Sequence, residues 1–316
     1  MTEFIVRRLL VALPVLLLVS LISASIMQLI PGDPAVMIAG QSATDLEIAA
    51  VREQLGLNQP FIERLGHWYL DLARGDLGDS ILLNRPVVQA IAERAPVTLA
   101  LAGFALLLTV AIGLPCGIIA AVRANTWVDQ AVLTFALIGV SVPNFWFSLM
   151  LIVLFGVMLG WLPAGGYVLF ADDPVGWVRC LILPGFSLAL LQVGLLTRIT
   201  RATMLEVLQQ DYVRTARAKG MSVWSVYGKH ALKNVMVPVI TVIGISFGLL
   251  LSGSVVIETV YSLPGMGRLL ANAVFGRDYP LIQGGLLVTA AMLVLLNLVV
   301  DVLYAVIDPR VKYGQR

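Results

Sequence analysis

Six long runs of apolar residues restrict what this chain can fold into. They cover about 9–30, 97–122, 130–161, 183–200, 235–260 and 283–307, and no run of charged residues interrupts them. A helix needs about 20 consecutive apolar residues to cross a bilayer. Charged residues make up only 13% of the chain, against about 25% in a typical soluble domain. The sequence therefore predicts an all-α integral membrane protein, with six transmembrane helices in a single domain, 1–316.

The first run follows two arginines, Arg7 and Arg8, as the core of a signal peptide would. Such a core is about 7–15 residues long, and the run is longer, so we expect a retained helix. Other basic residues concentrate in the C-terminal tail and at 201–234. Lysine and arginine favour the cytoplasmic side of a membrane. We therefore expect both termini and 201–234 to be cytoplasmic, and 31–96 to lie outside.

The outer segment, 31–96, is expected to form short helices rather than a domain. Thr44 and Glu47 have the spacing of a capping box, which satisfies backbone amides at a helix start. Glycine and proline residues then mark the ends and starts of further helices. These signals predict short helices over 45–55, 61–73 and 86–94.

The inner segment, 201–234, is the largest piece expected in the cytoplasm. Asp211 and Lys219 suit the two ends of a helix dipole, and Gly220 is a natural helix stop. We therefore expect a short helix at 211–219 and a second one at 223–237, which leads into the fifth apolar run. A solvated basic loop is the alternative, because charge alone does not distinguish the two.

The sequence predicts no catalytic residue, metal site or bound cofactor. A phosphate-binding loop needs G-x-x-x-x-G-K-[ST], and Gly228-Lys229 lacks the earlier glycine. The two histidines, His67 and His230, are expected on opposite sides of the membrane, which disfavours an intramembrane enzyme. Cys116 and Cys180 are expected to be packing residues. If ATP is used, another subunit hydrolyses it.

Polar side chains within the apolar runs are few. Such groups mark pathways for ions or solutes by default. Asp301 either pairs with a neighbour inside the bundle or forms part of a proton or substrate site. The scarcity of acidic and histidine residues disfavours ion-driven transport, but an ion-coupled secondary transporter remains the alternative. The candidates for the translocation path are Asn144, Gln192, Asn297 and Asp301.

Five local strings fall in order along the chain and together resemble one family. They are Pro31-Gly32-Asp33-Pro34, the segment Asp211 to Gly220 (DYVRTARAKG), Leu263 to Leu269 (LPGMGRL), Arg277-Asp278-Tyr279-Pro280 and Asp308-Pro309-Arg310. On a chain with six apolar runs they resemble the first permease subunit of the dipeptide, oligopeptide, glutathione and nickel ABC importers. The resemblance covers nearly the whole length.

This resemblance implies the type I ABC importer fold, as in the methionine importer, with 201–234 as the loop that couples to an ATPase. The general E-A-A-x-x-x-G pattern of this loop is matched only at Ala216 and Gly220, and the peptide branch is similar to this variant. The implied coupling residues are Asp211, Tyr212, Arg214, Thr215, Ala216, Ala218, Lys219 and Gly220. The implied outer gate or binding-protein contacts are Asp33, Pro264, Gly265, Gly267, Arg268 and Asp278.

The resemblance also implies the partners and the location. A bacterial inner membrane would hold this chain with a second, homologous permease. Two cytoplasmic ATPase subunits would hold ATP and Mg, and an extracytoplasmic solute-binding protein would deliver the solute. Dipeptides, oligopeptides and similar small solutes all fit the family. With a net charge of only +2, no nucleic-acid partner is expected.

Overall fold

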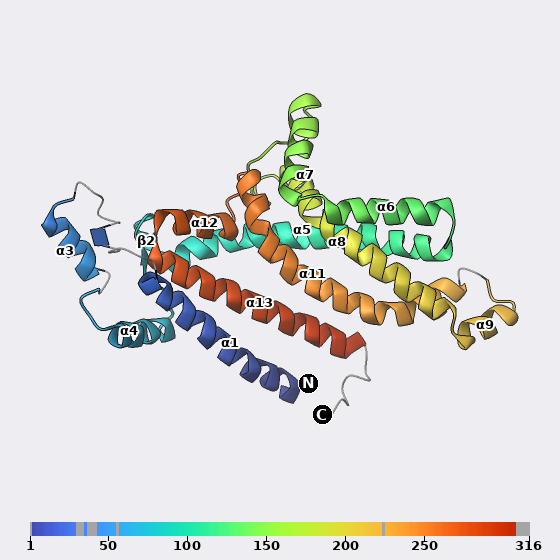
Figure 1. Ribbon diagram of the computed structural model, residues 1–316, viewed down its shortest axis with the longest axis horizontal. Coiled ribbons are helices and arrows are strands. Elements are labelled where there is room, and N and C mark those ends of the chain that lie inside the picture. Colours follow the sequence, from blue (N-terminus) through green and yellow to red (C-terminus); the bar gives the residue numbers. More distant parts are fainter. Residues whose placement is uncertain (1, 30–34, 37–42, 55–56, 223–224, 308–316) are drawn as a thin grey trace. The chain divides into compact units, whose positions relative to one another are not determined.

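The computed structural model describes residues 2–29, 35–36, 43–54, 57–222 and 225–307, and the chain in it is almost entirely helical (Figure 1). The elements form two compact units. Unit 1 contains Met1–Ala95 and Leu269–Val294, and unit 2 contains Pro96–Arg268 and Leu295–Arg316. Three helices, α5, α12 and α13, belong partly to each unit. The bounds of these three are Val87–Val122, Met266–Gly276 and Tyr279–Ile307.

Unit 1 contains α1 (Thr2–Leu29), α3 (Asp45–Gln54) and α4 (Phe61–Ala73). The predicted capping box is confirmed: the backbone N–H of Thr44 donates to Oε2 of Glu47 at 2.7 Å. The N–H of Glu47 donates back to Oγ1 of Thr44 at 3.4 Å. The helix predicted at 61–73 is confirmed with the same bounds, because Pro60 supplies the backbone geometry of a helix start.

The third helix predicted in this segment, at 86–94, is helical from residue 87 but is not a separate short helix. β1 (Asp79–Ser80) pairs antiparallel with β2 (Arg85–Pro86), and residues 87–94 form the start of the long helix α5. Pro96 lies inside α5 without ending it. Membrane helices tolerate proline because neighbouring groups satisfy the backbone carbonyl that it leaves free. The expected helix is therefore the first part of an apolar helix that continues to Val122.

Unit 2 is built around α8 (Pro174–Leu208), the most buried of its long helices. α6, α7 and α11 pack on it, and Figure 1 shows α6 running beside α8. Small residues allow the helices to approach closely. A Cβ atom added to Gly117 would lie only 2.6 Å from the Cβ of Thr200 on α8. Tight packing of small residues is a common basis of helix association in lipid.

The run predicted as one span at 130–161 is broken in the middle. α6 (Trp127–Ser141) and the pair formed by α7 (Asn144–Leu151) and the π-helix η1 (Ile152–Met158) meet at 104°. Val142 is extended, with φ −83° and ψ 126°. The following Pro143 disfavours helical geometry at the residue before it. Hydropathy reports that a segment is apolar but does not report its direction, so the bend was not predicted.

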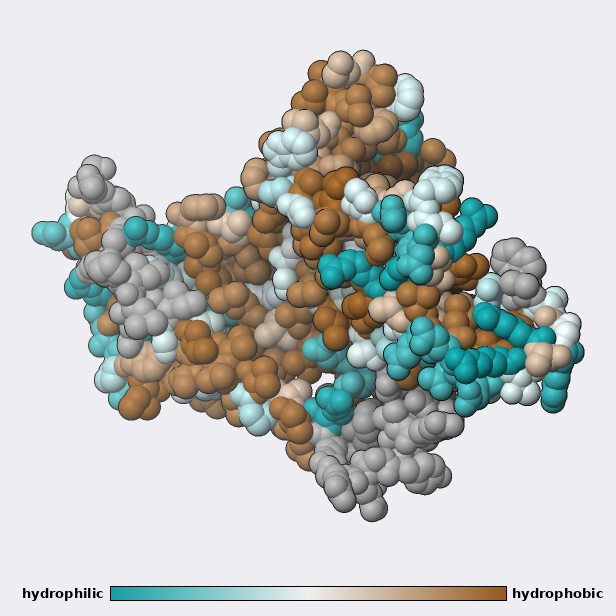
Figure 2. All heavy atoms as spheres, turned by 45° about the vertical axis from the view of Figure 1, so that its right-hand side comes forward, coloured by the Kyte–Doolittle hydropathy of each residue, from teal (hydrophilic) through white to brown (hydrophobic). Residues whose placement is uncertain are grey.

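Four described helices are long and apolar enough to cross a membrane: α5, α8, α11 (Leu232–Val260) and residues 279–302 of α13. The bent pair is a fifth if it forms one span. In α1, the apolar stretch recognised among the described residues is Leu10–Ser25, which is shorter. Six spans therefore remain a prediction. Figure 2 shows hydrophobic side chains over much of the visible face, with hydrophilic ones gathered around the α9 end of unit 2.

Candidate functional site

The polar end of unit 2 contains α9 (Asp211–Ala218), a two-turn helix between α8 and α11. Its start and stop were predicted from Asp211 and Gly220. Gly220 has a φ of +76°, which is the left-handed conformation that glycine adopts without steric cost. The N–H of Gly220 donates to the carbonyl of Arg217 at 2.9 Å. The helix therefore ends where glycine permits the chain to reverse.

One face of α9 is buried and the other is exposed. Val213 and Ala216 are buried against Val226 of the π-helix η2 (Val226–Ala231), which continues directly into α11. Ala216, one of the implied coupling residues, therefore does not present its side chain outward. The other predicted coupling residues are exposed: Asp211, Tyr212, Arg214, Thr215, Ala218, Lys219 and Gly220.

Two side-chain contacts attach α9 to η2 and to the start of α11. Nδ2 of Asn234 donates to the hydroxyl of Tyr212 at 2.6 Å. The guanidinium of Arg217 lies over the ring of Tyr227, 5.7 Å from its centroid, which is a cation–π contact. Arg217 is therefore held partly by its own chain, whereas Arg214 makes only an exposed 3.7 Å ion pair with Asp211. A displacement of α9 would thus reach α11 through the Tyr212 and Arg217 contacts.

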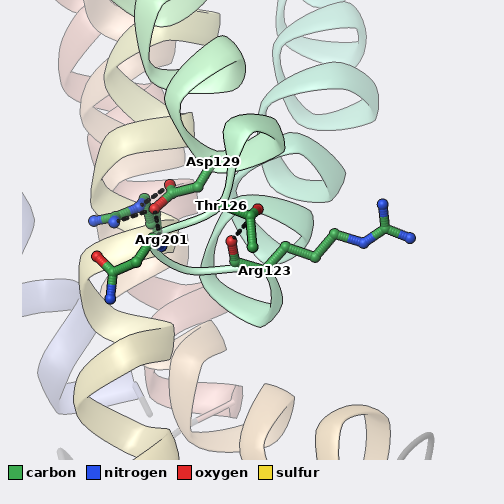
Figure 3. Close-up of polar contacts among 5 residues, drawn as sticks. Arg123, Thr126, Asp129 and Arg201 are labelled. Carbon is green, nitrogen blue, oxygen red and sulfur yellow. Dashed lines mark hydrogen bonds and ion pairs between the residues drawn. The ribbon is translucent and has the colours of Figure 1, made fainter.

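An ion pair fixes α8 to the turn between α5 and α6 (Figure 3). Asp129 is 2% exposed, and its carboxylate accepts two bonds from Arg201, from Nε at 2.6 Å and from Nη2 at 2.7 Å. The N–H of Asn125, which has a φ of +62°, also donates to Oδ2 of Asp129 at 2.9 Å. Thr126 closes the turn by donating to the carbonyl of Arg123 at 2.6 Å.

Sequence reasoning missed this pair. It counted Arg201 as one of many basic residues, and it began the third apolar run at 130, just after Asp129. The available signal was a lone carboxylate next to the polar end of an apolar helix, where a buried charge needs a partner. A bidentate contact with arginine is among the strongest such arrangements.

A buried carboxylate also organises the string at 263–269. Glu258 of α11 is fully buried and accepts from Oγ1 of Thr98 at 2.6 Å and from the N–H of Arg268 at 2.8 Å. Oγ1 of Thr98 accepts in turn from the N–H of Met266 at 2.8 Å. The carboxylate thus lies at the first turn of α12, where free amides and the helix dipole favour an anion.

The glycines of this string make room for that arrangement. A Cβ atom on Gly265 would lie 2.2 Å from the carboxyl carbon of Glu258, and one on Gly267 would lie 2.8 Å from the Cα of Val255. Both glycines are buried, and Pro264 and Arg268 are half-buried. Of the predicted outer gate residues, the two glycines are therefore packing elements inside unit 2. Asp33 lies outside the described residues.

Asp278, another predicted outer contact, is a structural residue of unit 1. It is fully buried, and its carboxylate accepts from the hydroxyl of Ser80, from the N–H of Leu82 and from the N–H of Leu281. The bond from Leu281 caps the start of α13. The bonds from Ser80 and Leu82 anchor the β-ribbon, the antiparallel pair of β1 and β2. A side chain used in this way is not free to contact a binding protein.

The four predicted path residues lie on three helices and in different surroundings. Gln192 of α8 is buried and accepts from the hydroxyl of Ser246 on α11 at 3.0 Å. Oδ1 of Asn144, just after the α6–α7 break, is buried without a hydrogen-bond partner among the described residues. On α13, Asn297 is exposed and Asp301 is half-buried. A role for these residues in the path stays a prediction.

Ser246 also belongs to a G-x-S-x-G string at 244–248, the spacing of a hydrolase nucleophile elbow. A nucleophile elbow requires a sharp strand-to-helix turn, whereas this string lies inside the helix α11. Its serine is buried and bonded to an amide rather than to a base. Ser246 is therefore a packing and hydrogen-bonding residue between α8 and α11.

The chain matches two family descriptions that together cover most of its length. Residues 113–313 match the family described as "Binding-protein-dependent transport system inner membrane component". Residues 1–102 match the N-terminal region of the membrane components of such systems. Residues 1–102 include α1, α3 and α4. Residues 113–313 include α9 and both of its flanking helices.

Named relatives match over almost the whole chain. A putative peptide transport system permease protein of Brucella abortus (strain 2308) is 49% identical over 99% of this chain and 100% of its own length. The dipeptide transport system permease protein DppB of Alkalihalophilus pseudofirmus is 42% identical, again over 99% and 100%. The glutathione transport system permease protein GsiC of Escherichia coli O6:H1 is 44% identical, with the same coverage.

A solved structure shares the fold. It is the MetNI methionine ABC transporter in inward-facing conformations, with a TM-score of 0.58 and 17% identity over 70% of this chain and 97% of that chain. This likeness shows an all-helical type I ABC importer fold. From the family matches, the close relatives and the fold, we conclude that the chain belongs to the inner-membrane permeases of binding-protein-dependent ABC importers, in the peptide-transport branch, and is a transport subunit rather than an enzyme.

Proposed function

We propose that this chain is one of two homologous permeases of an importer for short peptides or similar small solutes. Two separate ATPase subunits would supply the energy, with ATP and Mg held in them, and an extracytoplasmic binding protein would deliver the solute. Relatives named for peptide, dipeptide and glutathione transport support the solute class. The family's dependence on a binding protein supports the delivery step.

The observation that carries the proposal is the two-sided environment of α9. Its inner face is held by Val213 and Ala216, while its outer face leaves basic and polar side chains exposed. An exposed helix held rigidly by its own chain suits docking to another protein, because little ordering is needed on binding. Through η2, the same helix is joined to α11. Closure of the ATPases would therefore move α11, as alternating access between two states requires.

The proposal includes six spans with both termini in the cytoplasm. α9 then faces the ATPases, and α3, α4 and the β-ribbon face the binding protein. The exposed ion pairs on α9 are worth little individually. Hence the shape of the exposed face, with the basic residues at its rim, is expected to supply most of the docking energy.

Reconstitution tests the function. Both permeases and both ATPases in liposomes should take up labelled dialanine only when ATP and the loaded binding protein are present. Uptake by this chain alone, driven by an ion gradient without ATPases, would contradict the proposal. Mass spectrometry of the solute that co-purifies with the binding protein would identify the natural substrate.

Cross-linking tests the docking surface. In the assembled complex, Thr215→Cys on the exposed face of α9 should form a cross-link with an ATPase subunit. Ser262→Cys, an exposed residue at the other end of α11, should not. Equal cross-linking at both positions, or cross-linking at Ser262 alone, would remove α9 from the docking surface.

A further inference from the structure

Unit 1 contains a cavity, and the coupling, gate and path residues that the structure describes are absent from its lining. Its volume is ≈ 520 Å³, and its walls come from α4, from the segment around β1 and from α1 and α13. The lining residues that the structure describes all belong to unit 1. Small-molecule sites typically measure about 300–1,000 Å³. The cavity therefore has the size of a binding site for a small ligand.

One face of α4 supplies most of the polar lining. Residues spaced three and four apart lie on the same side of a helix, and this side carries both signs of charge. α4 is held against α1 by a 2.7 Å hydrogen bond between the hydroxyls of Tyr69 and Ser20. The polar face is therefore fixed in place. The lining residues of this face are Arg64, His67, Trp68 and Asp71.

Two donors in this lining lack a hydrogen-bond acceptor in the part of the chain that the structure describes. The guanidinium of Arg64 contacts the ring of Phe61, 5.8 Å from its centroid, and burial lowers the pKa of Arg64. Nε1–H of Trp68 is buried and has no acceptor among the described residues. Buried polar groups are bonded to protein or water in the large majority of cases. An oxyanion in the cavity would satisfy Arg64, and a small movement of the Trp68 ring would bring its N–H within reach of the same group.

Two carboxylates line the same cavity. Asp71 makes a 3.7 Å ion pair with the exposed Arg74, and Asp79 of β1 lies at the cavity with Gln283 of α13. Carboxylates in the lining disfavour a simple anion and favour a ligand that also carries an ammonium group. The lining thus offers partners for both charges of one small molecule.

We propose that this cavity binds a small zwitterion. The oxyanion of the ligand would accept from Arg64 and Trp68, and its ammonium group would lie against Asp71 and Asp79. Two sources share this chemistry: a short peptide with free termini and the phosphoethanolamine headgroup of a lipid. The proposal rests on the cavity and holds whether or not the transported solute is a peptide.

The test uses the assembled permease–ATPase complex, without binding protein, in nanodiscs of phosphatidylglycerol. Isothermal titration calorimetry would measure binding of dialanine and of soluble phosphoethanolamine. At least one of them should bind. Arg64→Gln and Asp79→Asn should each weaken binding by about ten- to a hundred-fold, because each removes one charged partner. Trp68→Phe, which keeps an aromatic ring and removes the N–H, should also weaken it.

A matched variant on the same helix controls for general effects of charge. Glu63→Gln changes an exposed residue of α4 outside the cavity, and binding should stay unchanged. Preference for dialanine would identify a peptide site, and preference for phosphoethanolamine a headgroup site. The proposal fails if neither ligand binds, or if inorganic phosphate or methylamine alone binds as tightly as either. It also fails if the folded charge variants bind like the wild type.

Discussion

Asp129 and Arg201 show how a single buried charge depends on its partner. Asp129→Asn removes the carboxylate and leaves Arg201, whose side chain is only 21% exposed, with a neutral partner. We expect a loss of about 1–3 kcal/mol in stability, below the cost for a fully buried pair because Arg201 is partly solvated. The difference in stability between Asp129→Asn and the wild type can be measured by unfolding the purified chain in detergent.

A matched carboxylate controls for the charge. Asp211 is 97% exposed and pairs with Arg214 at 3.7 Å. Asp211→Asn should leave stability close to that of the wild type, since exposed pairs contribute about 0–1 kcal/mol. If the two variants unfold alike, the ion pair of Asp129 is not a structural anchor.

Gly267 lies where a side chain does not fit. Gly267→Ala places a Cβ atom 2.8 Å from the Cα of Val255, so the backbone must shift. We expect destabilisation of about 1–3 kcal/mol and weaker attachment of the first turn of α12. Protease sensitivity around 262–270 and detergent unfolding report the two effects.

Gly66 is the control for that substitution. It lies in α4, and a Cβ atom there meets nothing within 4 Å. Gly66→Ala should be neutral or slightly stabilising, because alanine favours helices more than glycine does. Equal losses for both variants would show that Gly267 is not a packing position.

Among the elements, α9 depends on the stop at Gly220. Gly220→Asp introduces a charged side chain at a φ of +76°, which strains the turn between α9 and η2. We expect the complex to assemble and to hydrolyse ATP without uptake of solute. ATPase activity and uptake, measured on the same liposomes, separate coupling from assembly.

Gly228→Asp provides the matched change in η2. A Cβ atom on Gly228 meets nothing within 4 Å, and its φ is not in the left-handed range. Coupling should therefore be retained. Normal uptake by Gly220→Asp would remove α9 from the coupling role.

The stability of the first turn of α3 should depend on pH, because the Glu47 carboxylate is part of its capping box. Hydrogen bonds from the backbone N–H and the hydroxyl of Thr44 lower the pKa of Glu47. Because the pKa is lower in the folded helix, the stabilisation is present above the ordinary pKa of 4.5 and is lost as the pH falls through the lowered value. Hydrogen exchange of α3 amides, corrected for intrinsic rates, should show less protection at acidic pH. In Glu47→Gln this dependence should disappear.

For the whole molecule, the predicted orientation places α4 and α9 on opposite sides of the membrane. With Cys116 and Cys180 replaced, Glu63→Cys should react with an impermeant thiol reagent added outside intact cells. Thr215→Cys should react only after the membrane is opened. Reaction of Thr215→Cys with reagent added outside would contradict the predicted topology and rule out the proposed ATPase contact.

Local signals in the sequence determined the helices and several of their ends. Four of the apolar runs lie within α5, α8, α11 and α13, because an apolar segment of this length must satisfy its backbone internally in lipid. The capping box at Thr44, the proline before Phe61 and the glycine at 220 set boundaries that depend only on neighbouring residues. The five strings, read in order, identified the family.

Only the tertiary structure decided which residues meet. Asp129 finds Arg201 across 72 residues, Glu258 finds Thr98 across 160, and Asp278 finds Ser80 across 198. Hydropathy specifies which side chains leave water but not which helices become neighbours. For the same reason, the sequence placed Asp278 and the glycines of 263–269 at a contact surface, where the fold uses them internally. Pro143 is a local signal that a helix ends before it, but the angle of 104° between α6 and α7 is a tertiary feature that hydropathy does not record.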